Sequence, residues 1–185
     1  MQIKMQIYAN KFARLHIVVA FLLSACVTQH HLDFDKQQAA KARVELALGY
    51  LQQNDLVQAK LNLDRALVHA PNYYLVHSAL AHFYRLQGDN ENARREFNQA
   101  LKLDASQGDV HNNYGAFLCA QGEYEKAFEQ FNQALISANY YHQTDTLENM
   151  TLCAQAAGQQ ERYQESFNKL QKMDAARAQK LTQAK

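Results

Sequence analysis

The chain has 185 residues, a formal net charge of +1 and apolar residues at 48 % of its positions, which is enough for one domain with a hydrophobic core. One proline and six glycines are too few for a sandwich or barrel with many turns, and a mean hydropathy of −0.48 is typical of a soluble protein. The near-neutral charge gives no indication of a nucleic-acid partner. Ala, Gln, Leu, Asn and Glu dominate the composition, which favours helices.

The N-terminal segment has the organisation of a signal peptide. Three basic residues precede an apolar run at 15–23 that is too short to span a membrane, and small residues lead up to Cys26. This pattern predicts that residues 1–25 are removed. The Leu-Ser-Ala-Cys sequence that ends at Cys26 resembles the bacterial lipobox, which implies that Cys26 is lipidated, with palmitate among its acyl chains. The alternative is an ordinary secretory signal that has a cysteine at its end.

The lipobox resemblance implies a location as well as an anchor. The acyl chains would hold the mature protein firmly to a membrane. Val27 follows the cysteine, where the inner-membrane retention signal of such lipoproteins needs Asp. We therefore expect the protein on the periplasmic face of the outer membrane. Residues 26–39 show little periodicity and are interpreted as a lipid-anchored tether.

Three segments of equal length, 40–73, 74–107 and 108–141, repeat one pattern. In each, two amphipathic stretches with apolar residues three or four apart flank a short polar turn. Gly88 marks the turn of the second segment, because glycine enters the left-handed conformation at a helix end without steric cost. Asn54 takes that place in the first segment. The period of about 34 residues is that of tetratricopeptide repeats.

A fourth repeat is predicted at 144–173, after a small insertion. Tyr163 stands where the other repeats have alanine, so we expect an irregular hairpin there. Residues 174–185 are predicted to form a capping helix or a frayed tail. The expected fold is therefore all-α, an α-solenoid of about four helix-turn-helix repeats over 40–173.

The third and fourth repeats contain more specific segments. They read NNYG-x-FLC from Asn112 to Cys119, Tyr-Tyr at 140–141, and EN-x-x-LC-x-x-AG from Glu148 to Gly158. With the lipobox, they resemble the type IV pilus biogenesis and stability lipoproteins, the pilotins of the PilF/PilW family, over about 40–160. The resemblance implies a role in localising and assembling the outer-membrane secretin of the type IV pilus. The alternative is a scaffold lipoprotein for another envelope machine, in cell-wall synthesis or outer-membrane protein assembly.

A partner-binding groove is expected on the concave face, which the first helix of each repeat lines in this fold class. The first two repeats place mostly apolar residues there, while the third is smaller and more polar. We predict that an apolar segment of the secretin docks on these residues. Alternatively, Leu32 and Phe34 of the tether fold back and cover the patch. The predicted groove residues are Val44, Leu48, Leu51, Leu75, His82 and Leu86.

The remaining candidate chemistry is limited. Cys119 and Cys153 lie one repeat length apart, so they form either a disulfide in an oxidising periplasm or two buried thiols. The eight histidines include no HExxH pair, and no cysteines have zinc-ligand spacing, so no metal site or other cofactor is expected. There is no phosphate-binding glycine loop and no nucleophile elbow. The sequence predicts a protein that acts by binding rather than as an enzyme.

Overall fold

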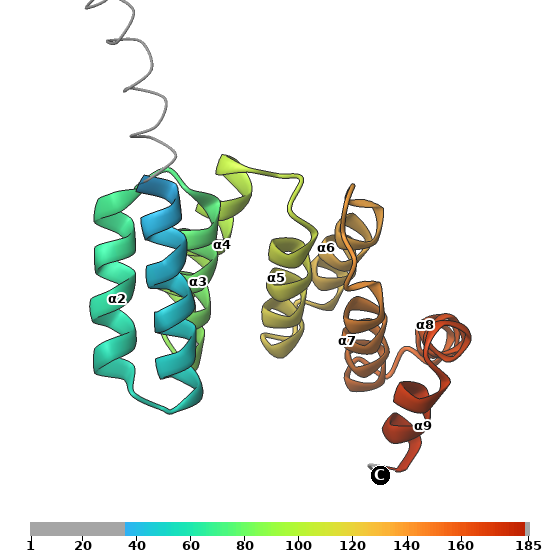
Figure 1. The fold of residues 1–185 in the computed structure, drawn as a ribbon. Helices are drawn as coiled ribbons and strands as arrows, with labels where there is room; N and C mark the ends of the chain where they lie inside the picture. Colours follow the sequence, from blue (N-terminus) through green and yellow to red (C-terminus); the bar gives the residue numbers. More distant parts are fainter. Residues whose placement is uncertain (1–35, 184–185) are drawn as a thin grey trace, which may run out of the picture.

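The computed structural model describes residues 36–183, and this part of the chain consists of helices and short connections (Figure 1). A first helix at 36–52 leads into the others, and together they form the α-solenoid that the sequence predicts. The predicted signal peptide, Cys26 and most of the tether lie outside the described residues. The labelled helices are α2 (Leu56–His69), α3 (Tyr74–Leu86), α4 (Asn90–Leu103), α5 (Gly108–Ala120), α6 (Tyr124–Ile136), α7 (Gln143–Ala156), α8 (Gln160–Met173) and α9 (Ala175–Gln183).

Residues 36–173 form four helical hairpins, and each has the same turn. The backbone is left-handed at Asn54, Gly88, Gly122 and Gly158, with φ between 58° and 77°. At each turn the next amide donates to a carbonyl five residues back, as Asp89 does to Tyr84, which satisfies the free carbonyls of the helix end. The turn residues named from the sequence are therefore correct, including the asparagine that replaces glycine in the first repeat.

The predicted boundary of the tether differs from the structure. Residues 36–39, assigned to the tether, already belong to the first helix. This stretch, Lys-Gln-Gln-Ala, contains good helix formers, and Ala40 directly after it is fully buried in the core. Propensity and packing therefore extend the helix beyond the point where the repeat pattern starts.

Small residues set the distance between the two helices of the second and third hairpins. Ala81 faces Ala93 in the second repeat, and Gly115 takes the place of Ala81 in the third. A Cβ atom built on Gly115 would lie 2.6 Å from Cε1 of Phe131, so only glycine fits at this distance. Both helices of the third hairpin therefore bury their facing sides completely.

The fourth hairpin is packed differently, as its sequence suggests. Thr151 stands at the position of Gly115, and its hydroxyl donates to the Ser166 hydroxyl of α8 at 3.0 Å. Tyr163 stacks on Phe167 with a 5.7 Å centroid distance, and neither side chain is fully buried. A pocket of about 360 Å³ opens beside them. The larger side chains thus replace close apolar packing by a polar contact and a hollow.

The C-terminal segment forms a capping helix as far as Gln183. α9 buries Ala178 and packs Leu181 against Leu147 and Leu170 of the fourth hairpin. Its outer face is polar, as the last element of a solenoid requires. Between residues 36 and 183, no helix combines the length and apolarity needed to cross a membrane.

Candidate functional site: the face lined by the first helix of each hairpin

The candidate site is the face formed by the first helix (36–52), α3, α5 and α7. The first helix and α3 share one apolar cluster, so they lie side by side. α5 and α7 are joined by a hydrogen bond from Asn149 to Asn112, 3.0 Å long, and by a disulfide. Tyr74 and Tyr84 of α3 pack against the apolar cluster that contains Val110 and Tyr114 of α5. The first helices of successive hairpins are therefore linked by contacts along the described chain.

Four of the six predicted groove residues are accessible on this part of the molecule. Leu48 and Leu75 are half-buried at the edge of the N-terminal core, and Leu86 is 47 % exposed. His82 is also half-buried, and its Nδ1 lies 3.1 Å from the Arg85 guanidinium. Burial and the nearby Arg85 charge lower the pKa of His82. These four residues can contribute to a contact surface.

Val44 and Leu51 correct the groove prediction. Val44 is 1 % exposed and Leu51 8 % exposed, so neither lines an open surface. With Ala40 and Ala47 they form a stripe, spaced four, three and four residues apart, that packs into the core shared with α2 and α3. The general repeat positions misplace them because the first helix turns this stripe toward its neighbours.

The N-terminal hairpin exposes apolar residues whose exposure was not predicted from the sequence. Leu46 is 50 % exposed, although its equivalent one repeat later, Leu80, is buried under the preceding hairpin. Leu46 and Tyr50 line an open hollow of about 660 Å³. A second hollow of about 530 Å³, between α2 and the end of α3, is lined by Val57, Leu61 and Phe83. The position of this hairpin could have indicated their exposure, because within the described residues no helix precedes it and covers these side chains.

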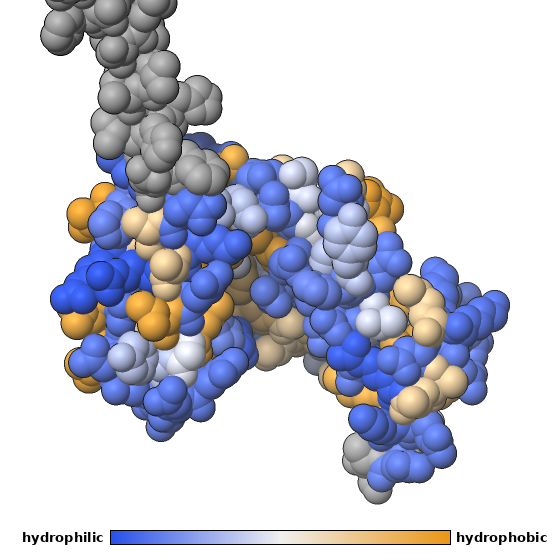
Figure 2. All heavy atoms as spheres, in the orientation of Figure 1, coloured by the Kyte–Doolittle hydropathy of each residue, from blue (hydrophilic) through white to orange (hydrophobic). Residues whose placement is uncertain are grey.

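Surface character changes from one end of the solenoid to the other. In Figure 2 the hydrophobic surface gathers over the first helix and α2, while hydrophilic residues dominate over α7 to α9. An apolar partner segment would therefore find its largest contact area on the first hairpin.

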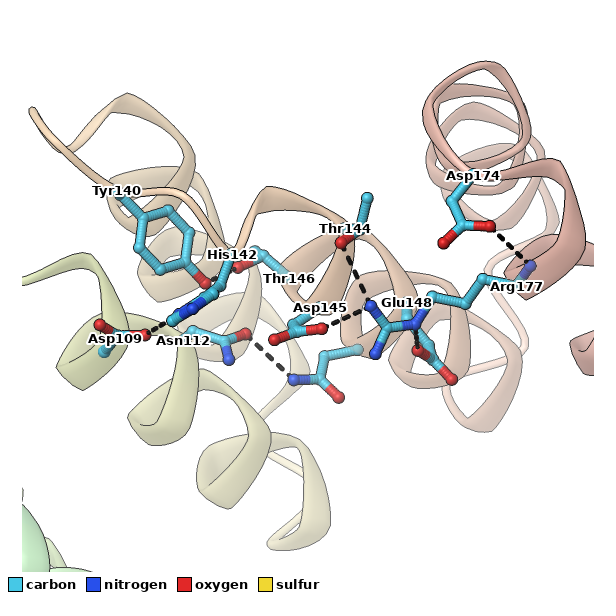
Figure 3. A network of polar contacts seen from close by, with 11 residues as sticks. Asp109, Asn112, Tyr140, His142, Thr144, Asp145, Thr146, Glu148, Asp174 and Arg177 are labelled. Atoms are coloured by element: carbon cyan, nitrogen blue, oxygen red, sulfur yellow. Dashed lines mark hydrogen bonds and ion pairs between the residues drawn. The ribbon is translucent and has the colours of Figure 1, made fainter.

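A polar network covers the C-terminal half of the face (Figure 3). His142 Nδ1 lies 2.8 Å from Asp109 Oδ1, and this hydrogen bond raises the pKa of His142. The Tyr140 hydroxyl hydrogen-bonds to Thr146 at 2.6 Å, while burial raises its pKa to about 12. These contacts link the start of α5 to the loop before α7 and to α7 itself. The polar side chains of this region are therefore hydrogen-bonded to one another within the protein.

Arg177 extends the network to α9. Its guanidinium contacts Glu148, donates to the Thr144 hydroxyl at 3.1 Å and pairs with Asp145 at 2.5 Å. Its backbone amide is capped by Asp174 at 2.9 Å. One arginine therefore provides the ion pairs that hold the capping helix onto α7.

The two cysteines of the third and fourth repeats form a disulfide in the structure. Cys119 on α5 and Cys153 on α7 are bonded, with their Cα atoms 5.8 Å apart. This is one of the two arrangements expected from their spacing. Cys26, Leu32 and Phe34 lie outside the described residues, so lipidation and the folded-back tether remain predictions. Among the residues that the structure describes, no group of three His, Cys, Asp or Glu side chains could hold a metal ion.

The helical hairpins and their superhelical stacking define a tetratricopeptide repeat protein. No protein-family model matches the chain. A protein of Haemophilus influenzae (strain Rd), described as uncharacterized, is 54 % identical over 169 residues, which cover 91 % of this chain and 94 % of that protein. The chain belongs to the same family as this Haemophilus protein.

Solved structures with the same fold include PilF and PilW. PilF of Pseudomonas aeruginosa matches 76 % of this chain with 30 % identity and a TM-score of 0.72. PilW, a widely conserved type IV pilus biogenesis factor, matches 74 % with 25 % identity and a TM-score of 0.68. The match spans 64 % and 62 % of those two chains, so this protein covers less than two thirds of their length. YrrB, a TPR protein with an unusual peptide-binding site, shares the fold at 16 % identity and a TM-score of 0.62.

Proposed function

We propose that this protein is a non-enzymatic outer-membrane lipoprotein that binds the type IV pilus secretin and helps it to localise and assemble. The observation that carries the proposal is the likeness to PilF, at 30 % identity over 76 % of this chain. The likeness to PilW, a type IV pilus biogenesis factor, points in the same direction.

Anchoring and recognition are assigned to different parts of the chain. Lipid on Cys26 would place the protein on the periplasmic face of the outer membrane, as the lipobox resemblance implies. Recognition is assigned to the N-terminal half of the solenoid, where Leu48, Leu75 and Leu86 offer an apolar surface to an extended or helical segment. The polar network of the C-terminal half would keep the third and fourth hairpins rigid behind it.

The proposal is tested by affinity purification from envelope extracts solubilised in detergent. The full chain carries a C-terminal tag, and the bound proteins are identified by mass spectrometry. We expect the secretin to be enriched, and we expect loss of secretin multimers in a deletion strain. Normal multimers in that strain, together with enrichment of cell-wall synthesis or outer-membrane insertion proteins, would replace the proposal by that of a scaffold for another envelope machine.

A further inference from the structure

His77 on α3 has both ring nitrogens directed at hydrogen-bond acceptors. Its Nδ1 lies 2.7 Å from Oε2 of Glu96 on α4, and its Nε2 lies 2.8 Å from the carbonyl oxygen of Pro71. The residue is only 8 % exposed, and the Glu96 side chain is similarly covered. Solvent therefore has little access to the bond between His77 and Glu96.

The two acceptors determine the charge that this arrangement requires. A carbonyl oxygen only accepts, and so does a carboxylate, so both ring nitrogens must carry a proton for both bonds to form. That species is the imidazolium. A neutral ring would keep the bond to Pro71 and turn a lone pair toward the partly buried Glu96 carboxylate, which loses a charge-assisted hydrogen bond.

A histidine with the same two hydrogen-bond positions occurs one repeat later, but one of its partners is different. His111 on α5 lies 2.8 Å from Oε1 of Gln130 on α6 and 3.0 Å from the carbonyl oxygen of Ala105. A carboxamide can turn either its oxygen or its NH₂ group toward the ring, so a neutral His111 can also satisfy both bonds. The third repeat therefore has an acceptor that does not require a charged ring, and the second repeat has one that does.

The contact of His77 joins the first hairpin to the second. Pro71 lies in the connection between α2 and α3, and Glu96 lies in the middle of α4. Arg95 approaches the other oxygen of Glu96 at 3.6 Å but is largely exposed. Among the described residues, α2 and the first helix contribute no ion pair or hydrogen bond to the ring. Glu96 is therefore the charged group that acts on His77, and its hydrogen bond raises the pKa of the imidazole against the opposing effect of burial.

We propose that His77 is a proton-controlled clamp at the junction of the first and second hairpins. As the imidazolium, it holds the 70–73 connection against α4 and fixes how the first hairpin is set on the rest of the solenoid. Loss of the proton releases the bond to Glu96 and keeps the bond to Pro71, so the 70–73 connection, which leads from the first hairpin, is held less firmly against α4. The first hairpin is also the one that exposes most apolar surface, so the clamp controls the element with the greatest capacity for contacts.

The protonation state is tested by NMR titration of the full chain, labelled with ¹³C-histidine and purified in detergent. Spectra of His77→Gln and His111→Gln variants assign the two rings. We expect the titration midpoint of His77 to lie above 6.5 and to fall in Glu96→Gln, because that variant loses the charge-assisted hydrogen bond. A His77 midpoint at or below 6.5, or one that Glu96→Gln leaves unchanged, would overturn the proposal.

The mechanical consequence is tested by amide hydrogen exchange of the same protein at pH 5.5 and pH 8.5, corrected for intrinsic exchange. Protection of residues 70–76 should fall several-fold at the higher pH. The equivalent residues 104–110 should keep their protection, and Glu96→Gln should remove the pH dependence at 70–76. Equal pH dependence in both segments would show that His77 does not control the junction.

Discussion

The disulfide between Cys119 and Cys153 joins the first helices of the third and fourth hairpins, which are the hairpins that differ most in packing. The third is closed around Gly115 and Phe131, whereas the fourth contains a hollow beside Tyr163. A covalent bond between α5 and α7 therefore attaches the loosely packed hairpin to the closely packed one.

Replacing both cysteines by serine should destabilise the protein by about 2–4 kcal/mol, because the unfolded chain regains the freedom that the bond removes. Urea unfolding of the two forms measures the difference. Reductant should destabilise the wild-type protein and leave the double variant unchanged. Complete alkylation of the native protein without reductant would show that the bond is absent and would contradict this prediction.

Gly115→Ala should destabilise the protein by about 1–3 kcal/mol, because the added methyl group would overlap Phe131 and crowd the Ala127 carbonyl. Gly49→Ala is the matched control. Gly49 also lies within a helix, but a Cβ atom there meets nothing within 4 Å. The control should be neutral or stabilising by up to about 1 kcal/mol, since alanine favours the helix. Thermal and urea unfolding compare the two, and equal effects would refute the role assigned to Gly115.

The sequence predicted the fold well because repeated patterns carry several independent signals. Apolar spacing, the residues of the left-handed turns and the small residues between helices all recur with one period, so a mistake in one is corrected by the others. The irregular fourth hairpin was also foreseeable, since Tyr163 cannot fit where alanine sets the helix distance. The extension of the first helix to residues 36–39 could not be predicted in this way, because these residues lie before the first repeat and the repeat pattern does not include them.

The candidate site was less predictable for a physical reason. A repeat position describes an average neighbourhood, but the first hairpin lacks a preceding neighbour among the described residues. Leu46 is therefore exposed where Leu80 is buried. Val44 is buried where an open surface was expected, because its stripe packs into the core shared with α2 and α3. The contact of His77 with Glu96 and Pro71 brings together three segments whose distances the sequence does not state. Such contacts can be identified only in the three-dimensional structure.

Leu86→Glu should weaken binding of the proposed secretin partner without lowering the melting temperature, because Leu86 is already half exposed. A charge there opposes burial against an apolar segment. Val68→Glu is the control, since Val68 is an exposed valine on α2, outside the predicted groove. Affinity purification from envelope extracts, with melting curves of both variants, measures the effect. Undiminished recovery of the secretin by folded Leu86→Glu would remove this residue from the site.

Arg177→Ala should release α9 from α7, because Arg177 provides its ion pairs to Asp145 and Glu148. The global effect should stay below about 1 kcal/mol, since these groups are partly exposed and screened by solvent. Hydrogen exchange of residues 175–183 should instead rise several-fold. Lys169→Ala removes an exposed ion pair within α8 and serves as the control, with no expected change in α9. Unchanged protection of α9 in Arg177→Ala would mean that Ala178 and Leu181 suffice to hold it.

The stability difference between the wild-type protein and Glu96→Gln should depend on pH in one direction. Because the folded state raises the pKa of His77, the contribution of the ion pair is fully present below about pH 6.5, where the unfolded histidine is also protonated. It is lost as the pH rises through the higher pKa of the folded state. Urea unfolding between pH 5 and 9 should show the wild type more stable by about 1 kcal/mol at the acidic end. This advantage should be lost at the alkaline end, where the amide of the Glu96→Gln variant can donate to the neutral ring. A difference that grows with pH would contradict the charged form of His77.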